Sequence, residues 1–342
     1  MSKYNHFITE NIAPKGTKII NVYNKGQKIG VIPLGSLTPP TSTKQYSFCV
    51  ISDVHVQYDT AESDLIRALQ YVENNDIEFT CICGDLTSGG THAELKKYKE
   101  IIDLNSTKPV YATSGNHETA AGDPTDRVPQ YTENPIFYSV EKGNDVFIFT
   151  GYRSTAWSWT DFLTVDNMQW LYETLERYRN KRCFVFQHVY PYQHGVGDAG
   201  RYYGGFYWST SDKNTGELFI NLLKHYKNTI LFHGHSHLRF HLQEISTKAN
   251  YSSEFGYRSV HIPSLAVPRD RVNDVTEVIF AESEGYIVDV YDGFIILNGR
   301  DFIDNGRDGN IIPIGTYKID TTLQYIPEKS FVDVLGLIDT NK

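Results

Sequence analysis

The sequence contains few cysteines and no long apolar run. Its cysteines, Cys49, Cys81, Cys83 and Cys183, lie inside or at the start of strand-like runs, where a free thiol serves as a small hydrophobic side chain. Their spacing fits neither a disulfide framework nor a cysteine zinc site. No apolar run is long enough to span a bilayer, and residues 1–14 lack the charged-then-apolar pattern of a signal peptide. We therefore expect a soluble, cytoplasmic protein with reduced cysteines and no membrane partner.

The sequence also lacks an excess of positive charge. Its formal net charge is −9, which disfavours a protein that holds nucleic acid through a broad basic surface. A local positive groove remains compatible with this charge, so small anions can still be substrates. At 342 residues the chain is long enough for one large α/β domain with additions or for two smaller domains, and we favour the first.

The order of strand-like and helix-like segments predicts an α/β fold. Residues 17–33 have the pattern of a hairpin, and residues 37–43 have the proline and hydroxyl content of a linker. From Tyr46 strands and helices alternate, which is typical of a parallel sheet with helical crossovers. Thr91 and Glu94 resemble a capping box at the start of a helix. The expected elements in this region are strands at 47–51, 79–83 and 110–113, and helices at 62–74 and 94–104.

A second group of strand-like runs lies between residues 146 and 297. These runs are too many for one simple doubly wound sheet, so we predict two packed mixed β-sheets with helices outside them. We divide the chain into an N-terminal hairpin extension and linker at 1–44, a catalytic domain at 45–300, and a C-terminal extension of short strands at 301–342.

Five apolar runs each end in residues that can bind a metal ion. Because open α/β sheets place their chemistry at the carboxyl ends of strands, such residues can converge on one site. Each signal alone is weak, since a histidine after a strand is more often structural, but the ordered combination is strong. The residues are Asp53 and His55, then Asp85, then Asn116 and His117, then His188, and finally His235 and His237.

The local spacing gives some of these residues a specific use. Asp53 and His55 are two positions apart, so on an extended backbone their side chains project to the same side and can reach one ion. Gly84 precedes Asp85 and lets the backbone turn closely beneath a bound ion. The Asp85 carboxylate could then bridge two cations.

The ordered blocks Asp-x-His, Gly-Asp, Gly-Asn-His-Glu, a lone His and Gly-His-Ser-His resemble the signature of the calcineurin-like metallophosphoesterase superfamily. The resemblance implies a four-layer αββα sandwich with a binuclear metal centre. It also implies that His117 meets the substrate or leaving group rather than a metal, whereas His233 matches no ligand position and is expected to be structural. The implied ligands are Asp53, His55, Asp85 and His237 for one ion, and Asp85, Asn116, His188 and His235 for the other.

Two such ions suit phosphate chemistry. Two divalent ions against two carboxylates leave a local excess of about +2, so an acidic protein can still attract phosphate. Ions roughly 3.5–4 Å apart can polarise phosphoryl oxygens and lower the pKa of bound water, so that a metal-activated hydroxide attacks and no protein nucleophile is needed. The mixed nitrogen and oxygen ligands accept manganese, iron or zinc.

The residues around these motifs bear on the branch of the superfamily. Protein serine/threonine phosphatases carry Asp-Arg-Gly shortly after Gly-Asp, and purple acid phosphatases carry a tyrosine ligand three residues after the bridging aspartate. Here Leu86-Thr87-Ser88 follows Asp85, so the chain has neither the Asp-Arg-Gly sequence nor the tyrosine ligand. His188-Val189-Tyr190-Pro191 looks like the His-x-x-Pro of class III cyclic-nucleotide and glycerophosphodiester phosphodiesterases. We therefore predict a small phosphodiester as substrate, with a phosphomonoesterase and a nuclease as alternatives.

Substrate selection is predicted to lie in the insertion at 190–216, which is rich in glycine and aromatic residues. Its aromatic side chains could stack on a base, and its basic ones could meet a phosphate oxygen. Arg153 is a weaker candidate for the same role. A different class of function is a partner-docked, virion-associated module that keeps the metal motif and docks through its appended ends. The candidate substrate contacts are Asn116, His194, Arg201 and Tyr203.

Overall fold

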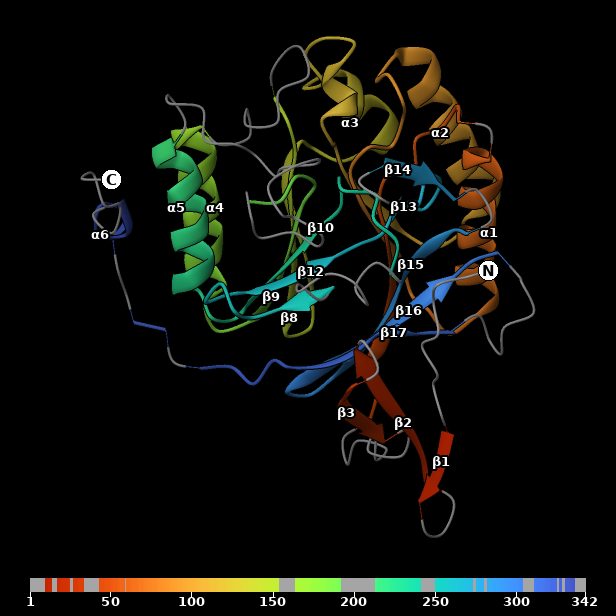
Figure 1. Ribbon diagram of the computed structural model, residues 1–342. Helices are drawn as coiled ribbons and strands as arrows, with labels where there is room; N and C mark the ends of the chain where they lie inside the picture. The colour runs from red at the N-terminus through yellow and green to blue at the C-terminus, as the bar shows by residue number, and fades with distance from the viewer. Residues whose placement is uncertain are drawn as a thin grey trace. The chain divides into compact units, whose positions relative to one another are not determined.

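The chain forms two compact units, residues 1–44 and 45–342 (Figure 1). In the first unit, β1 (Glu10–Ala13), β2 (Thr17–Asn24) and β3 (Gln27–Pro33) form an antiparallel sheet, which confirms the hairpin expected at 17–33. The computed structural model describes residues 10–13, 17–24, 27–33, 43–58, 60–153, 164–191, 213–240, 250–272, 275–279, 282–303, 311–324, 326–327 and 330–335.

The second unit contains a six-stranded sheet in the order β17-β16-β15-β4-β5-β6. Strands β4, β5 and β6 are parallel, and β15, β16 and β17 are added antiparallel, so the sheet is mixed. Residues 311–320, assigned from the sequence to a C-terminal extension, form its edge strand β17. The bounds are β4 (Tyr46–Ile51), β5 (Thr80–Cys83), β6 (Val110–Thr113), β15 (Glu284–Tyr291), β16 (Phe294–Asp301) and β17 (Ile311–Asp320).

A second six-stranded sheet has the order β11-β12-β10-β9-β8-β7. Its strands β8, β9, β10 and β12 are parallel, and β7 and β11 pair antiparallel at the two edges. A separate two-stranded ribbon consists of β13 (Arg269–Val272) and β14 (Val275–Val278). The bounds in the large sheet are β7 (Phe137–Lys142), β8 (Asp145–Thr150), β9 (Arg182–Gln187), β10 (Thr229–His233), β11 (Tyr251–Ser252) and β12 (Arg258–His261).

The two sheets pack face to face through aromatic side chains. Phe48 of β4 lies 5.1 Å from Phe147 of β8 and 5.3 Å from Phe184 of β9, measured between ring centroids. Because side chains alternate along a strand, the neighbours Cys49 and Ile51 face the opposite side and join the core beneath the helices. Strand β4 is therefore buried on both faces, as expected for a strand covered by helices on one side and a sheet on the other.

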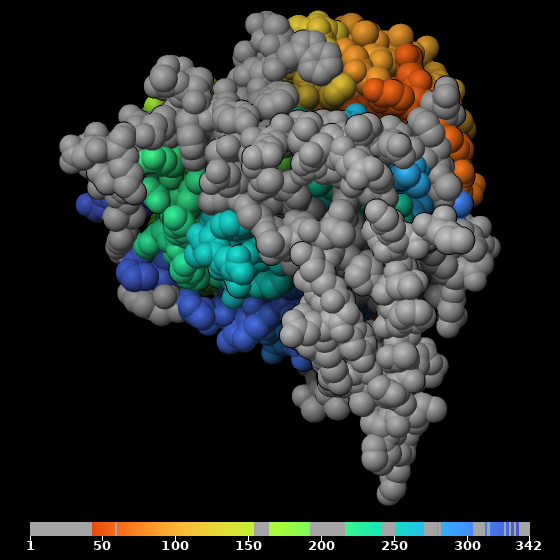
Figure 2. Space-filling model, viewed as in Figure 1, coloured from red at the N-terminus to blue at the C-terminus, as the bar shows by residue number. Residues whose placement is uncertain are grey.

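Helices complete the four-layer αββα arrangement that the sequence predicted. α1 (Ala61–Asn74) and α2 (His92–Asn105) lie on one outer side, and α4 (Val165–Arg177) and α5 (Lys213–His225) lie on the other (Figure 1). In the space-filling view the orange segment that contains α1 and α2 and the green segment that contains α5 lie on opposite sides of the face shown (Figure 2). Within the described residues, no helix has the length and apolar character needed to cross a membrane. The short helices are α3 (Arg127–Thr132), α6 (Phe331–Leu335) and the 3-10 turn η1 (His117–Thr119).

The start of α2 confirms the expected capping box. The Thr91 hydroxyl accepts a hydrogen bond from the Glu94 backbone N–H, and the Glu94 carboxylate accepts one from the Thr91 backbone N–H. Two backbone donors at the helix N-terminus are thereby satisfied.

A buried ion pair links the two sheets at the ends where β4, β8 and β9 begin. Arg182 donates to both carboxylate oxygens of Asp145, at 2.7 and 2.8 Å. Tyr46 of the opposite sheet donates its hydroxyl to the same carboxylate. Arg182 also donates to the Tyr291 carbonyl at 3.0 Å and to the Thr321 hydroxyl at 2.9 Å. Both charges are therefore satisfied by fixed partners from both sheets.

We expect Arg182→Ala to lower the free energy of unfolding by about 3–5 kcal/mol, because it leaves the Asp145 carboxylate buried without its cation. Urea denaturation followed by circular dichroism measures this change. Arg179→Ala is the matched control, since its partner Glu176 lies 3.2 Å away and both side chains are partly exposed. The control substitution should lower the free energy of unfolding by about 1 kcal/mol or less. Equal costs for the two variants would contradict the prediction.

Candidate metal centre

The polar residues that follow five strands meet at the carboxyl ends of both sheets. Strands β4, β5 and β6 of one sheet lead into Asp53 and His55, Asp85, and Asn116. Strands β9 and β10 of the other lead into His188 and into the His235 to His237 turn. The structure brings them into two groups that share Asp85. One group contains Asp53, His55, Asp85 and His237, and the other contains Asp85, His188 and His235.

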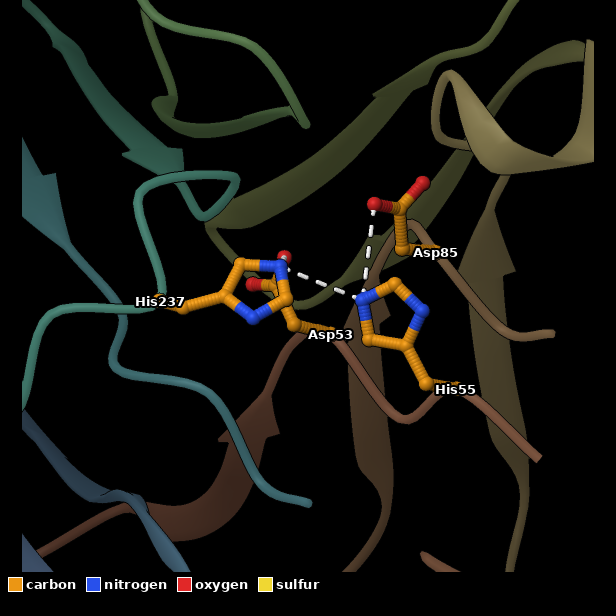
Figure 3. Close-up of side chains that lie close together, drawn as sticks. All are labelled: Asp53, His55, Asp85 and His237. Atoms are coloured by element: carbon orange, nitrogen blue, oxygen red, sulfur yellow. Dashed lines mark hydrogen bonds and ion pairs between the residues drawn. The ribbon is translucent and has the colours of Figure 1, made fainter. Parts of the chain in front are cut away.

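The first group has the spacing expected of ligands around one ion (Figure 3). The Nε2 atoms of His55 and His237 are 3.1 Å apart, and Nε2 of His237 is 3.1 Å from Oδ1 of Asp53. Nε2 of His55 is 3.7 Å from Oδ2 of Asp85. Ligands that each bind an ion at about 2.1 Å lie roughly 3.0–3.4 Å from one another in octahedral or tetrahedral geometry. These side chains can therefore hold one ion with small adjustments.

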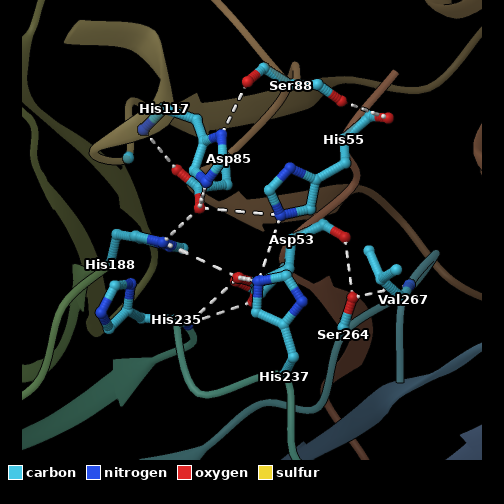
Figure 4. Close-up of polar contacts among 12 residues, drawn as sticks. Asp53, His55, Asp85, Ser88, His117, His188, His235, His237, Ser264 and Val267 are labelled. Carbon is cyan, nitrogen blue, oxygen red and sulfur yellow. Dashed lines mark hydrogen bonds and ion pairs between the residues drawn. The ribbon is translucent and has the colours of Figure 1, made fainter. Parts of the chain in front are cut away.

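The side chains of the second group, Asp85, His188 and His235, are drawn in Figure 4, and a hydrogen bond to a residue outside the group orients His188. His188 donates its Nδ1–H to the Cys83 carbonyl at 2.7 Å, so its Nε2 is the nitrogen turned toward Asp85. That Nε2 lies 3.0 Å from Oδ2 of Asp85. Asp85 is thus the carboxylate that belongs to both groups of described residues, in the position of a bridge.

Buried polar atoms in the centre fit a cation. Oδ2 of Asp85 and Nε2 of His188 are buried and lie 3.0 Å from each other, whereas Oδ1 of Asn116 is buried and makes no hydrogen bond. Buried polar atoms without a partner are rare in folded proteins. A positive ion would satisfy the Asn116 oxygen and would take the place of the proton between His188 and Asp85, and the mixed imidazole, carboxylate and amide set suits manganese, iron or zinc. The residues present therefore fit the two-ion centre that the motif implies.

The backbone at the centre is strained. In the described parts of the chain, seven residues other than glycine have positive φ. Such conformations cost free energy and concentrate at functional sites. The extended backbone expected at 53–55 is wrong, because β4 ends at Ile51 and left-handed residues aim both side chains inward. Five of the seven belong to the centre, namely Asp53 (52°), His55 (49°), Asp85 (49°), His235 (71°) and His237 (60°).

Two glycines permit the close packing. A Cβ at Gly115 would lie 2.1 Å from Oδ1 of Asp85, and one at Gly84 would lie 2.7 Å from the His188 ring. Gly84 also has a φ of +84°, a conformation that glycine adopts without strain. Any other residue at either position would displace the shared carboxylate or its histidine.

Burial and neighbouring charges set the ionisation of the centre. Burial alone would raise the pKa of Asp85, but His188 and His117 hold it well below its ordinary range. Burial would lower the pKa of His188, but the carboxylates of Asp85 and Asp53 raise it to about 9. For His235 burial dominates and lowers the pKa to about 3. Without an ion, protonated His188 therefore compensates the two carboxylates.

His117, which the sequence predicted to meet the substrate or leaving group, is partly exposed at the centre. Its side chain is 20% exposed, and its Nε2 is 3.9 Å from Oδ2 of Asp85. Its Nδ1–H donates to the Ser88 carbonyl at 2.7 Å. This bond leaves Nε2 as the nitrogen that can exchange a proton near the centre.

Glu118 is a supporting residue that sequence reasoning missed. Its carboxylate accepts from the Gly115 N–H at 2.7 Å, and from the N–H and hydroxyl of Thr87, both at 3.0 Å. It thereby ties the loop after β5 to the loop after β6. Burial and the nearby Asp85 carboxylate raise the pKa of Glu118 to about 7.

A second missed support is the segment that follows β12. Ser264 donates its hydroxyl to the Asp53 carbonyl at 3.0 Å (Figure 4). The Arg269 N–H donates to the His237 carbonyl at 2.7 Å. Nε2 of His261 is hydrogen-bonded to Oγ of Ser236 at 2.6 Å, between the two histidines of the final motif. The segment carries no ligand motif, so the only sequence signal is its position after a strand-like run.

The other predicted residues have different outcomes. His194, Arg201 and Tyr203 lie outside the described residues, and Asn116 lies buried in the centre. Arg153 is exposed, and its guanidinium lies 4.6 Å from the Phe137 ring. His233 is buried on β10 with its ring 4.9 Å from that of Tyr190, and the structural role expected for it stays a prediction.

The pKa of His188 predicts how metal binding depends on pH. A proton on Nε2 must leave before that atom can bind an ion, and below pH 9 most of the metal-free protein carries this proton. We expect the apparent affinity for Mn²⁺ to rise about tenfold per pH unit from about pH 6.5 to about pH 8.5. Calorimetric titration in two buffers with different heats of ionisation measures both the affinity and the proton released. An affinity that stays constant across this range would contradict the prediction.

Several solved structures share the fold, at identities that show the fold alone. A dimetal phosphatase from Danio rerio has a TM-score of 0.57 and 12% identity, and the match covers 82% of this chain and 100% of that chain. A purple acid phosphatase from yellow lupin seeds has a TM-score of 0.53 and 15% identity, with 80% of this chain and 53% of that chain covered. GAP50, the anchor in the inner membrane complex of Plasmodium, has a TM-score of 0.53 and 12% identity, covering 86% of this chain and 94% of that one.

Comparison by sequence gives the family. No curated protein matches the chain significantly. Residues 46–239, more than half of the chain, match the family model described as calcineurin-like phosphoesterase. Together with the buried aspartate and histidine groups, this match supports a dimetal phosphoesterase. The chain belongs to the calcineurin-like phosphoesterase family.

Proposed function

We propose that the protein hydrolyses small phosphodiesters at a two-ion centre. The observation that carries the proposal is the sharing of Asp85 between two buried groups of ligand atoms. In this proposal Asp85 bridges the two ions. The remaining ligands are Asp53, His55 and His237 for one ion, and Asn116, His188 and His235 for the other.

The chemistry divides between the ions and the chain. When bound, two such ions would supply positive charge for the phosphoryl oxygens and would lower the pKa of a water molecule. Asp53 and Asp85 would hold the ions, and their hydrogen bonds to backbone N–H groups fix the orientation of both carboxylates. Among the polar residues of the centre, His117 combines partial exposure with a nitrogen directed at the shared carboxylate. We assign to its Nε2 the transfer of a proton to the leaving oxygen.

The charge near the bridging carboxylate supports a diester over a monoester. A phosphomonoester carries close to two negative charges at pH 7, whereas a diester carries one. The loop from Gly84 to Thr91 has no arginine or lysine to meet the second charge. In this loop the Thr87 hydroxyl donates a hydrogen bond to the Glu118 carboxylate. The His188-to-Pro191 sequence, similar to that of cyclic-nucleotide phosphodiesterases, supports the same substrate class.

A second candidate role is docking to a partner, in addition to hydrolysis. Residues 1–44 form a separate compact unit whose strands belong to neither large sheet. GAP50, a similar structure, is named as an anchor in a membrane complex. A role for residues 1–44 in attachment would leave the metal centre available for catalysis.

Two substitutions separate metal binding from proton transfer. We expect Asp85→Asn to lose tight Mn²⁺ binding and turnover together, because the shared carboxylate is lost. His117→Ala should keep Mn²⁺ affinity and lose about 10²–10⁴-fold in kcat, the usual contribution of a general acid. Calorimetry and steady-state kinetics measure the two effects. His92→Ala, an exposed histidine of α2, is the control and should change neither. Full activity in metal-depleted Asp85→Asn would refute the assignment.

The substrate class is tested by a panel of phosphoesters. After reconstitution with Mn²⁺, we expect kcat/KM for bis(p-nitrophenyl) phosphate to exceed that for p-nitrophenyl phosphate by at least about tenfold, because the loop from Gly84 to Thr91 offers no basic side chain to a second negative charge. Cyclic nucleotides and single-stranded DNA complete the panel. A preference for the monoester would refute the diesterase proposal, and a preference for DNA would favour a nuclease.

A further inference from the structure

Tyr58 is an aromatic residue left exposed close to the metal centre. In the described part of the chain, four large hydrophobic residues are exposed, and Tyr58, at 41%, is the aromatic among them. It lies five positions after Asp53, between the end of β4 and the start of α1. The apolar body of a tyrosine ring gains free energy from burial, so an exposed ring beside a functional centre has surface available for a ligand.

The position of Tyr58 is fixed by its contacts. Its ring centroid lies 5.4 Å from that of His55, with an interplanar angle of 81°. Its N–H donates to the His55 carbonyl at 3.0 Å, and its carbonyl accepts from the Ala61 N–H at 3.1 Å. Gln57, directly before it, has a φ of 97°, a strained conformation outside glycine. The strained turn and these contacts hold the ring beside a side chain of the first metal group.

Solvent reaches the centre at His117, which contacts the same histidine as Tyr58. The His55 ring that contacts Tyr58 also contacts His117, with centroids 4.6 Å apart. The side chain of His117 is 20% exposed, whereas those of His55 and Asp85 are each 1% exposed. A phosphoester that approaches the centre therefore passes His117, which contacts the same His55 ring as Tyr58 does.

We infer that Tyr58 forms an aromatic subsite, which stacks on an aryl group or nucleobase attached to the phosphorus of the substrate. The inference rests on the proposed function and narrows its substrate class to phosphoesters with an aromatic substituent. Stacking of this kind needs a fixed ring with a free surface close to the phosphate site, and Tyr58 meets each condition. The same stacking tolerates different bases and aryl groups, because each offers a π face.

The test measures binding rather than turnover. Calorimetry of the Mn²⁺-loaded protein gives dissociation constants for phenyl phosphate and for inorganic phosphate, which differ by the aromatic group. Tyr58→Ala should raise the dissociation constant for phenyl phosphate about tenfold and change that for inorganic phosphate by no more than about twofold. Tyr58→Phe keeps the ring and should bind both probes as the wild type does. Leu104→Ala, which removes an exposed apolar side chain on α2, should change neither affinity.

Three outcomes would overturn the subsite. These are unchanged phenyl phosphate binding in Tyr58→Ala, an equal loss for both probes, and wild-type protein that binds neither probe. An equal loss would mean that Tyr58 only supports His55, and unchanged Mn²⁺ affinity in the variant checks that the ligands stay in place. Wild-type protein that binds phenyl phosphate through Tyr58 but hydrolyses no ester would defeat the proposed hydrolysis and leave the subsite standing.

Discussion

The structure depends on two carboxylates, Asp53 and Asp85, buried near each other where the two sheets meet. Buried charges are costly unless oppositely charged groups or ions compensate them. Here histidines surround them, and protonated His188 supplies compensation when no ion is bound. Glycines let the chain approach the carboxylates, and left-handed residues turn the ligands inward. The strain at these residues is maintained because the sheets and the supporting loops hold the backbone on every side.

The centre also requires both sheets to keep one relative position. Asp53 and Asp85 extend from one sheet, whereas His188 and His237 extend from the other. A shift of one sheet against the other by about 1 Å would separate the ligand atoms from a common ion, since metal–ligand distances vary by only about 0.2 Å. The interlocked phenylalanines between the sheets and the Arg182 ion pair at the far ends of the strands oppose such a shift. Packing between the sheets, far from the metal centre, therefore helps to keep the ligand atoms at the correct distances.

Sequence reasoning succeeded where residues that can bind a metal directly follow a predicted strand. The two-sheet fold and the convergence of the aspartates and histidines followed from the order of strands and ligands. It failed where the position of a side chain depends on backbone conformation or on hydrogen bonds between segments far apart in the sequence. An extended backbone was expected at Asp53 and His55, but positive φ cannot be identified from those residue types alone. The supports Glu118 and Ser264 were missed because their hydrogen bonds join segments that no local pattern relates.

The ligands themselves offer little basis for choosing one phosphoester over another. They are almost fully buried, and with ions bound they would present the same two cations to any phosphoryl group. Discrimination must come from groups at the exposed side, where His117 and Tyr58 both contact the His55 ring. One ring there can offer a proton to the leaving oxygen and the other a surface to an aromatic group. Because both rest on a metal-site histidine, binding of the ion and recognition of the ester are structurally coupled.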